Sequence, residues 1–227
     1  MTGKKWLPAV LALALVPAII VGTYVLLQSI FAQPTMQEMV PPALAAFFDT
    51  FDQDNSKGIN FAESQAFFNW CKANIPYRYD DENAANPVPG SPVGDGRPGK
   101  EYWQKPIETY NERAGDCEDM AILSAAFYRY YNIMAYIATV NAEGAEVDHA
   151  VCIVKIGATP QEAAEYLGGL VYYELEGSYY MLVDVAYSNQ FGLAGSNPGE
   201  ASQLLEQGKF VIQDRITLEA AYMMSEM

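Results

Sequence analysis

The most apolar stretch of the chain lies near its N-terminus. Trp6 to Ala32 is 27 residues without a charge, and Lys4 and Lys5 come directly before it. An uncharged stretch of this length can cross a bilayer core of about 30 Å as a helix. We therefore expect residues 1–32 to be a single-pass anchor in the cell membrane. Basic residues favour the cytoplasmic side, so the N-terminus is expected inside and the rest of the chain outside the cytoplasm. The alternative is a cleaved signal peptide that ends at Ala32 and leaves a secreted protein.

Beyond this segment, apolar residues first recur with helical spacing. The pattern predicts helices over Ala43–Phe51 and Ser64–Asn74, on either side of the polar loop Asp52–Glu63. Asp116–Tyr131 is apolar almost all round, which predicts a helix buried at the centre of the domain.

Strand-like runs come after the helices. They cover Ala135–Val140, Val147–Ile156, Leu170–Leu175, Tyr179–Tyr187 and Phe210–Ile216, with turn signals at Glu143-Gly144 and Glu176-Gly177. The Pro- and Gly-rich residues Asn83–Gly99 predict a long loop, as do most of Ser188–Gly208. Helices followed by strands are typical of an α+β fold, here an antiparallel sheet packed on the core helix.

The chain is strongly acidic. It holds 13 Lys and Arg against 28 Asp and Glu, and all but Lys4 and Lys5 lie in residues 33–227, which carry a net charge of −17. Such a surface repels a phosphate backbone, so nucleic acid is not an expected partner. It suits calcium or basic partners instead.

Of the three cysteines, Cys71, Cys117 and Cys152, at least one must be unpaired because the number is odd. Cys117 falls in the first turn of the predicted core helix, with Asp116 as its N-cap. A helix N-terminus favours the thiolate, which is the nucleophilic form. The acidic residues Glu118 and Asp119, together with Asp116, oppose this effect unless they point away.

A proton acceptor for Cys117 has one candidate, because His149 is the only histidine. In a strand, His149 shares a face with Val151, and Cys152 points to the other face as a core residue. Asp184 is embedded in an apolar run, where a carboxylate is costly without a partner. His149 is that partner if the two strands are neighbours. Taken singly, each residue has a structural alternative: a small core thiol, a structural histidine, or an aspartate that begins a bulge.

Three motifs in order resemble the transglutaminase-like superfamily. They are Gly115-Asp-Cys-Glu-Asp119 at a helix start, Asp148-His-Ala150 at a strand start, and Leu182-Val-Asp184. Tyr102-Trp-Gln-Lys-Pro-Ile-Glu-Thr109 resembles the segment that the family places before its cysteine motif.

The resemblance implies a papain-like core and acyl transfer through a thioester to water or to an amine, with a protein or peptide as substrate. By motif, Cys117 is the nucleophile, His149 the base and Asp184 the residue that orients the imidazole. The resemblance also makes Trp103 a candidate wall of the site or second oxyanion donor.

The loop Asp52–Glu63 has the spacing of an EF-hand calcium loop. Oxygen ligands are expected from the side chains of Asp52, Asp54, Ser56, Asn60 and Glu63 and from the backbone of Gly58. Lys57 stands where this loop ordinarily has glycine. The alternative is an Asx-rich helix cap that binds no ion.

These observations predict three parts: the anchor at 1–32, an EF-hand-like helix-loop-helix at 40–74 and a transglutaminase-like domain at 67–227. The leading hypothesis is a membrane-anchored cysteine enzyme, a protease or transglutaminase, that acts on peptide or amide bonds. The alternative is a non-catalytic scaffold on the same fold, with a membrane assembly as its partner.

Overall fold

The computed structural model describes residues 33–82, 102–142, 149–167, 173–188, 191 and 210–225. The predicted anchor, the loop at 83–99 and the turn at 143–144 lie outside these residues. Residues 35–227 form one compact unit, distinct from residues 1–34. Within the described part of the chain, no helix is both long and apolar enough to cross a bilayer.

The first helices are α2 (Met36–Met39), α3 (Pro42–Phe48) and α4 (Phe61–Asn74). The last two are the predicted helices with shifted ends. The second begins three residues earlier than predicted because Asn60 caps it, accepting a hydrogen bond from the backbone N–H of Glu63. A single 3₁₀ turn, η1 (Asp80–Glu82), follows.

The central helix is α6 (Cys117–Tyr130), preceded by α5 (Pro106–Glu112). Every residue of α6 from Asp119 to Tyr128 is buried, as its apolar sequence predicts. Asp116 is its N-cap, so Cys117 is the first helical residue.

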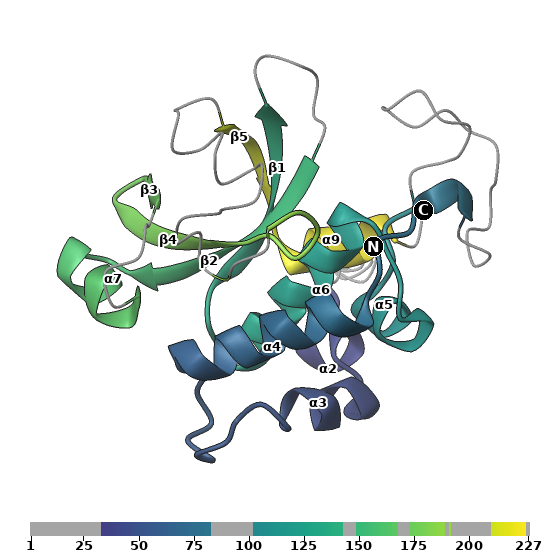
Figure 1. Ribbon diagram of the computed structural model, residues 1–227, viewed down its shortest axis with the longest axis horizontal. Coiled ribbons are helices and arrows are strands. Elements are labelled where there is room, and N and C mark those ends of the chain that lie inside the picture. Colours follow the sequence, from purple (N-terminus) through teal and green to yellow (C-terminus); the bar gives the residue numbers. More distant parts are fainter. Residues whose placement is uncertain are drawn as a thin grey trace, which may run out of the picture. The chain divides into compact units, whose positions relative to one another are not determined.

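Five strands form one antiparallel sheet in the order β3-β4-β2-β1-β5 (Figure 1). Their bounds are β1 Ala135–Ala142, β2 His149–Gly157, β3 Tyr173–Leu175, β4 Ser178–Val183 and β5 Phe210–Ile216. The predicted turn at Glu176-Gly177 joins β3 to β4, with φ of 50° and 70° at its two residues. The predicted α+β fold with an antiparallel sheet is confirmed.

The end of β4 differs from the prediction, and this difference concerns the site. The fourth predicted strand stops at Val183, so Asp184 follows the strand instead of lying within it, and residues 185–187 form a turn. Four short helices among the described residues were not predicted: α2, α5, α7 (Pro160–Leu167) and α9 (Leu218–Met224). Of these, α7 packs on β2 and β4, and α9 packs on α6 and β1.

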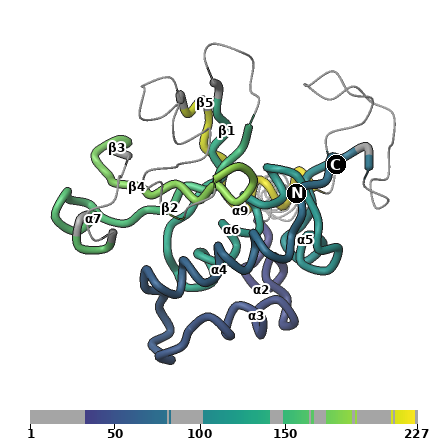
Figure 2. The backbone as a smooth tube through the Cα atoms, viewed as in Figure 1, coloured from purple at the N-terminus to yellow at the C-terminus, as the bar shows by residue number. Residues whose placement is uncertain are grey.

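The sheet and the first helices both contact α6 (Figure 2). On the sheet side, Cys152 and Val154 of β2 belong to the core shared with α6, whereas Val151 and Ile153 form a second apolar cluster. On the helix side, Phe67 of α4 stacks on Phe127 of α6 with ring centroids 3.9 Å apart and planes 2° apart. The helix that carries Cys117 is therefore fixed from both sides.

Candidate functional site

Cys117 lies at the start of α6, where the helix presents unpaired backbone N–H groups. Its side chain is 7% exposed, and all three cysteines are free thiols. Gly115 lies two residues before Cys117 and packs tightly: a Cβ on this residue would lie 2.6 Å from Cβ of Asp119. Any side chain at position 115 would therefore clash with Asp119, which explains why the motif has glycine there.

His149 and Asp184 meet at neighbouring strand ends. β2 begins at His149 and β4 ends one residue before Asp184, and the two strands pair antiparallel. The imidazole Nε2 lies 3.2 Å from Oδ1 of Asp184. The same Oδ1 accepts a hydrogen bond from the backbone N–H of Tyr187 at 3.0 Å, which fixes the carboxylate.

The thiol of Cys117 lies near enough to His149 to affect the charge of the imidazole. Burial of His149 favours its neutral form, but hydrogen bonding to Asp184 and to Cys117 outweighs burial and raises the pKa of His149 to about 10. Since Nε2 is paired with Asp184, Nδ1 is the nitrogen left for the thiol, and Nδ1 is buried without a hydrogen-bond partner of its own. The structure therefore brings together Cys117, His149 and Asp184.

The acidic residues around Cys117 do not all point away from it. The thiol donates a hydrogen bond to Oε2 of Glu118 at 2.9 Å. Asp119 turns inward instead, is fully buried, and accepts hydrogen bonds from the backbone N–H groups of Gln104 at 2.8 Å and Asp116 at 3.3 Å. Only Glu118 thus acts directly on the sulfur.

A buried acidic cluster lies beneath the helix start. Carboxylate oxygens of Asp80, Asp116 and Asp119 come within 4.8 Å of one another. The pKa of Asp119 is raised by burial and by the charges of Asp116 and Asp80. Because Asp119 also binds the backbone of Gln104, the cluster ties the segment before α5 to the start of α6.

Two tyrosines of the site were not predicted. The hydroxyl of Tyr77 donates to Sγ of Cys117 at 3.9 Å, and the ring of Tyr187 lies edge-on to His149 with centroids 4.6 Å apart. The two tyrosine rings are 5.8 Å apart. Tyr187 ended a predicted strand and Tyr77 followed a predicted helix end, so neither position carried a signal of its own.

Trp103 is half-buried against the core that includes α6. Among the described residues, its indole makes no hydrogen bond or ring contact with Cys117, His149 or Asp184. Its role as a wall or oxyanion donor stays a prediction.

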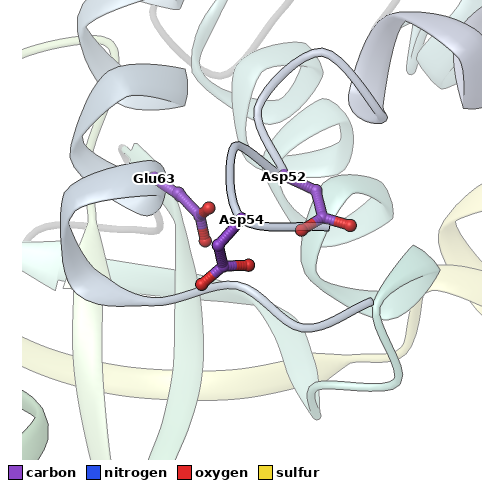
Figure 3. A group of neighbouring side chains, drawn as sticks. All are labelled: Asp52, Asp54 and Glu63. Carbon is purple, nitrogen blue, oxygen red and sulfur yellow. The ribbon is translucent and has the colours of Figure 1, made fainter. Parts of the chain in front are cut away.

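The acidic loop between α3 and α4 gathers three of its six predicted ligands. Carboxylate oxygens of Asp52, Asp54 and Glu63 lie within 4.8 Å of one another (Figure 3). Backbone N–H groups of the loop already donate to them: Ser56 to Asp52 and Asp54, Gln53 to Glu63. Carboxylates have further lone pairs, so the three residues fit a hard cation.

The other predicted ligands act within the loop. Asn60 uses its side-chain oxygen to cap α4, and Oγ of Ser56 accepts from the backbone N–H of Gly58 at 3.2 Å. Lys57 adopts the left-handed conformation, with φ of 61°, that glycine would adopt more easily.

Residues 56–160 match the family described as "transglutaminase-like domain". The matched residues include Cys117 and His149 but end before Asp184. No curated protein matches the chain.

Among solved structures, a protein from Cytophaga hutchinsonii described as a "putative cysteine protease" has a TM-score of 0.39 and 15% identity, covering 79% of this chain and 48% of its own. The chain spans about half the length of that protein. The resemblance to the transglutaminase-like superfamily, first indicated by the motif around Cys117, is thus confirmed over residues 56–160.

Proposed function

We propose that the protein is a cysteine enzyme that transfers an acyl group from a peptide or amide bond through a thioester on Cys117. The observation that carries the proposal is the imidazole of His149, which Asp184 holds through Nε2 while its Nδ1 stays buried and unpaired near Cys117. A nucleophile, a base and an orienting carboxylate in this order are the parts that such chemistry needs.

The steps follow from these groups. His149 takes the thiol proton of Cys117, and the thiolate attacks the carbonyl carbon, forming a C–S bond while the carbonyl electron pair moves onto oxygen. Collapse of this intermediate breaks the C–N bond, and His149 returns the proton to the leaving amine. Water or an amine then attacks the thioester and releases the thiol. The backbone N–H of Cys117, at the helix start, is one donor for the oxyanion.

The test uses the purified full-length protein with p-nitrophenyl acetate as acyl donor. We expect a burst of p-nitrophenolate and an acetyl group on the peptide that contains Cys117, detected by mass spectrometry. Cys117→Ala should abolish both, whereas Cys152→Ala, which removes a fully buried core thiol, should keep the burst. A wild-type burst that survives in Cys117→Ala would refute the proposal.

The hydrogen bond from Sγ of Cys117 to Glu118 favours a second candidate, a non-catalytic scaffold, because a nearby carboxylate stabilises the neutral thiol. In that case Glu118→Gln should leave the protein as inert as the wild type. An enzyme should instead gain reactivity toward iodoacetamide when this charge is removed.

Calcium and membrane attachment are further parts of the proposal. Asp52, Asp54 and Glu63 would hold one Ca²⁺ and so stiffen the connection between α3 and α4. The uncharged segment 6–32 would anchor the chain, with the enzyme outside the cytoplasm and protein or peptide substrates reaching it there. Protease added to intact cells should then digest residues 33–227; full protection until lysis would reverse this orientation.

A further inference from the structure

We infer that Tyr77 is a catalytic residue of this site, whose hydroxyl donates a hydrogen bond to the oxyanion formed when Cys117 attacks an acyl group. The inference rests on the proposed function and adds to it the second oxyanion donor, a role for which Trp103 was the candidate from sequence.

The backbone fixes Tyr77 beside the nucleophile. Tyr77 forms an isolated parallel bridge with Gly115, and the backbone N–H of Arg78 donates to the carbonyl of Gly115 at 2.9 Å. Gly115 is two residues before Cys117, so Tyr77 and the start of α6 move as one piece. The position of the hydroxyl relative to Sγ is therefore set by main-chain contacts.

The hydroxyl stands at the distance that the role requires. It lies 3.9 Å from Sγ of Cys117, which is long for a hydrogen bond to sulfur. At this distance, the oxygen of an acyl group bonded to Sγ could lie about 3 Å from the hydroxyl, which is the separation that an oxyanion donor needs. The hydroxyl is thus aimed at the space where charge develops.

The hydroxyl also stays a donor. Burial of Tyr77 raises its pKa, and the neighbouring Cys117 and Tyr187 raise it further. A phenol that keeps its proton beside Cys117 can donate a hydrogen bond to negative charge that develops there. In the attack step the C–S bond forms, the carbonyl π electrons move to oxygen, and Tyr77 shares its proton with that oxygen without transferring it.

The experiment compares Tyr77→Phe with the wild type in two reactions of Cys117. Acylation by p-nitrophenyl acetate passes through an oxyanion, whereas alkylation by iodoacetamide displaces iodide and forms none. Tyr77→Phe should lower the acylation rate constant by about 10²-fold. It should leave the apparent KM and the rate of alkylation, over its whole pH profile, within about twofold.

Tyr79→Phe is the matched control, because its ring packs against Tyr77 at 4.9 Å and the change also removes one hydroxyl. It should acylate at the wild-type rate. If Tyr77→Phe acylates at the wild-type rate, the inference about Tyr77 is overturned but the proposed function is not. An equal fall in acylation and alkylation would overturn the inference too, because Tyr77 would then support the thiolate or the fold. A wild type without any burst would overturn both the inference and the proposed function.

Discussion

Replacing Gly115 by alanine tests how tightly the start of α6 is packed. The added Cβ would lie 2.6 Å from Cβ and 2.7 Å from Oδ2 of Asp119, both closer than real contacts allow. Relief by rotating Asp119 is costly because its carboxylate is fully buried and accepts two backbone hydrogen bonds. The backbone must move instead.

The size of the effect follows from this geometry. Overpacking a core by one methyl group typically lowers the free energy of unfolding by 1 to 3 kcal/mol, and a neighbour that cannot move favours about 2 to 3. In a domain of this size that corresponds to roughly 4–12 °C in Tm. Since Gly115 also pairs with Tyr77, the acylation rate should fall together with stability.

The assay is thermal and urea unfolding of the full-length protein, followed by tryptophan fluorescence. Gly58→Ala is the control: its Cβ would meet only Oγ of Ser56, at an ordinary 3.5 Å, so its Tm should change by about 2 °C or less. A Gly115→Ala protein as stable as Gly58→Ala would refute the reasoning about Asp119.

Two further predictions concern the charges of the site and of the loop. The pKa of His149 is raised from its ordinary 6.5 to about 10, so its contribution to stability is complete below pH 6.5 and is lost as pH rises toward 10. Urea unfolding at pH 6 and pH 10 should show a loss on the order of 3 to 5 kcal/mol in the wild type relative to His149→Gln. The loss of unfolding free energy in Asp184→Asn should lie between the losses in the wild type and in His149→Gln. Equal pH dependence of the wild type and His149→Gln would contradict the ion pair between His149 and Asp184. For calcium, isothermal titration should give one site with Kd of about 10⁻⁴ to 10⁻³ M. Lys57→Gly should lower the Kd, because glycine adopts the left-handed backbone conformation more easily. Glu63→Gln should abolish calcium binding. If Glu63→Gln gives the same heat of calcium binding as the wild type, this loop is not the calcium site.

Periodicity predicted the fold well where burial repeats regularly. The apolar positions of α6 run through the whole helix, and the turn at Glu176-Gly177 contains a glycine, which adopts positive φ without a steric cost. Strand ends were harder, because the apolar run from Tyr179 to Tyr187 continues past Val183, where the hydrogen-bonded pairing stops. Side-chain hydrophobicity does not show where backbone pairing ends.

The residues of the candidate site likewise include some that could be predicted from the sequence and some that could not. His149 and Asp184 could be predicted because a histidine and a carboxylate are rare in apolar strands, and Cys117 was singled out by its position at the helix start. Tyr77 and Glu118 could not, since tyrosine and glutamate are common and only the folded geometry brings their side chains to the sulfur. Likewise, the buried position of Asp119 depends on Gln104, which lies 15 residues away in the chain.

Cys117 belongs to the central helix, whereas His149 and Asp184 lie at strand ends of the sheet. Cys117 and His149 meet only after α6 has docked on β2, and Asp184 must then arrive from a strand end 35 residues beyond His149. Contacts so far apart in sequence form late in folding, because the intervening chain must be closed first. A partly folded chain would therefore expose an ordinary thiol, and the proposed reactive centre would form only once the domain has reached its final packing.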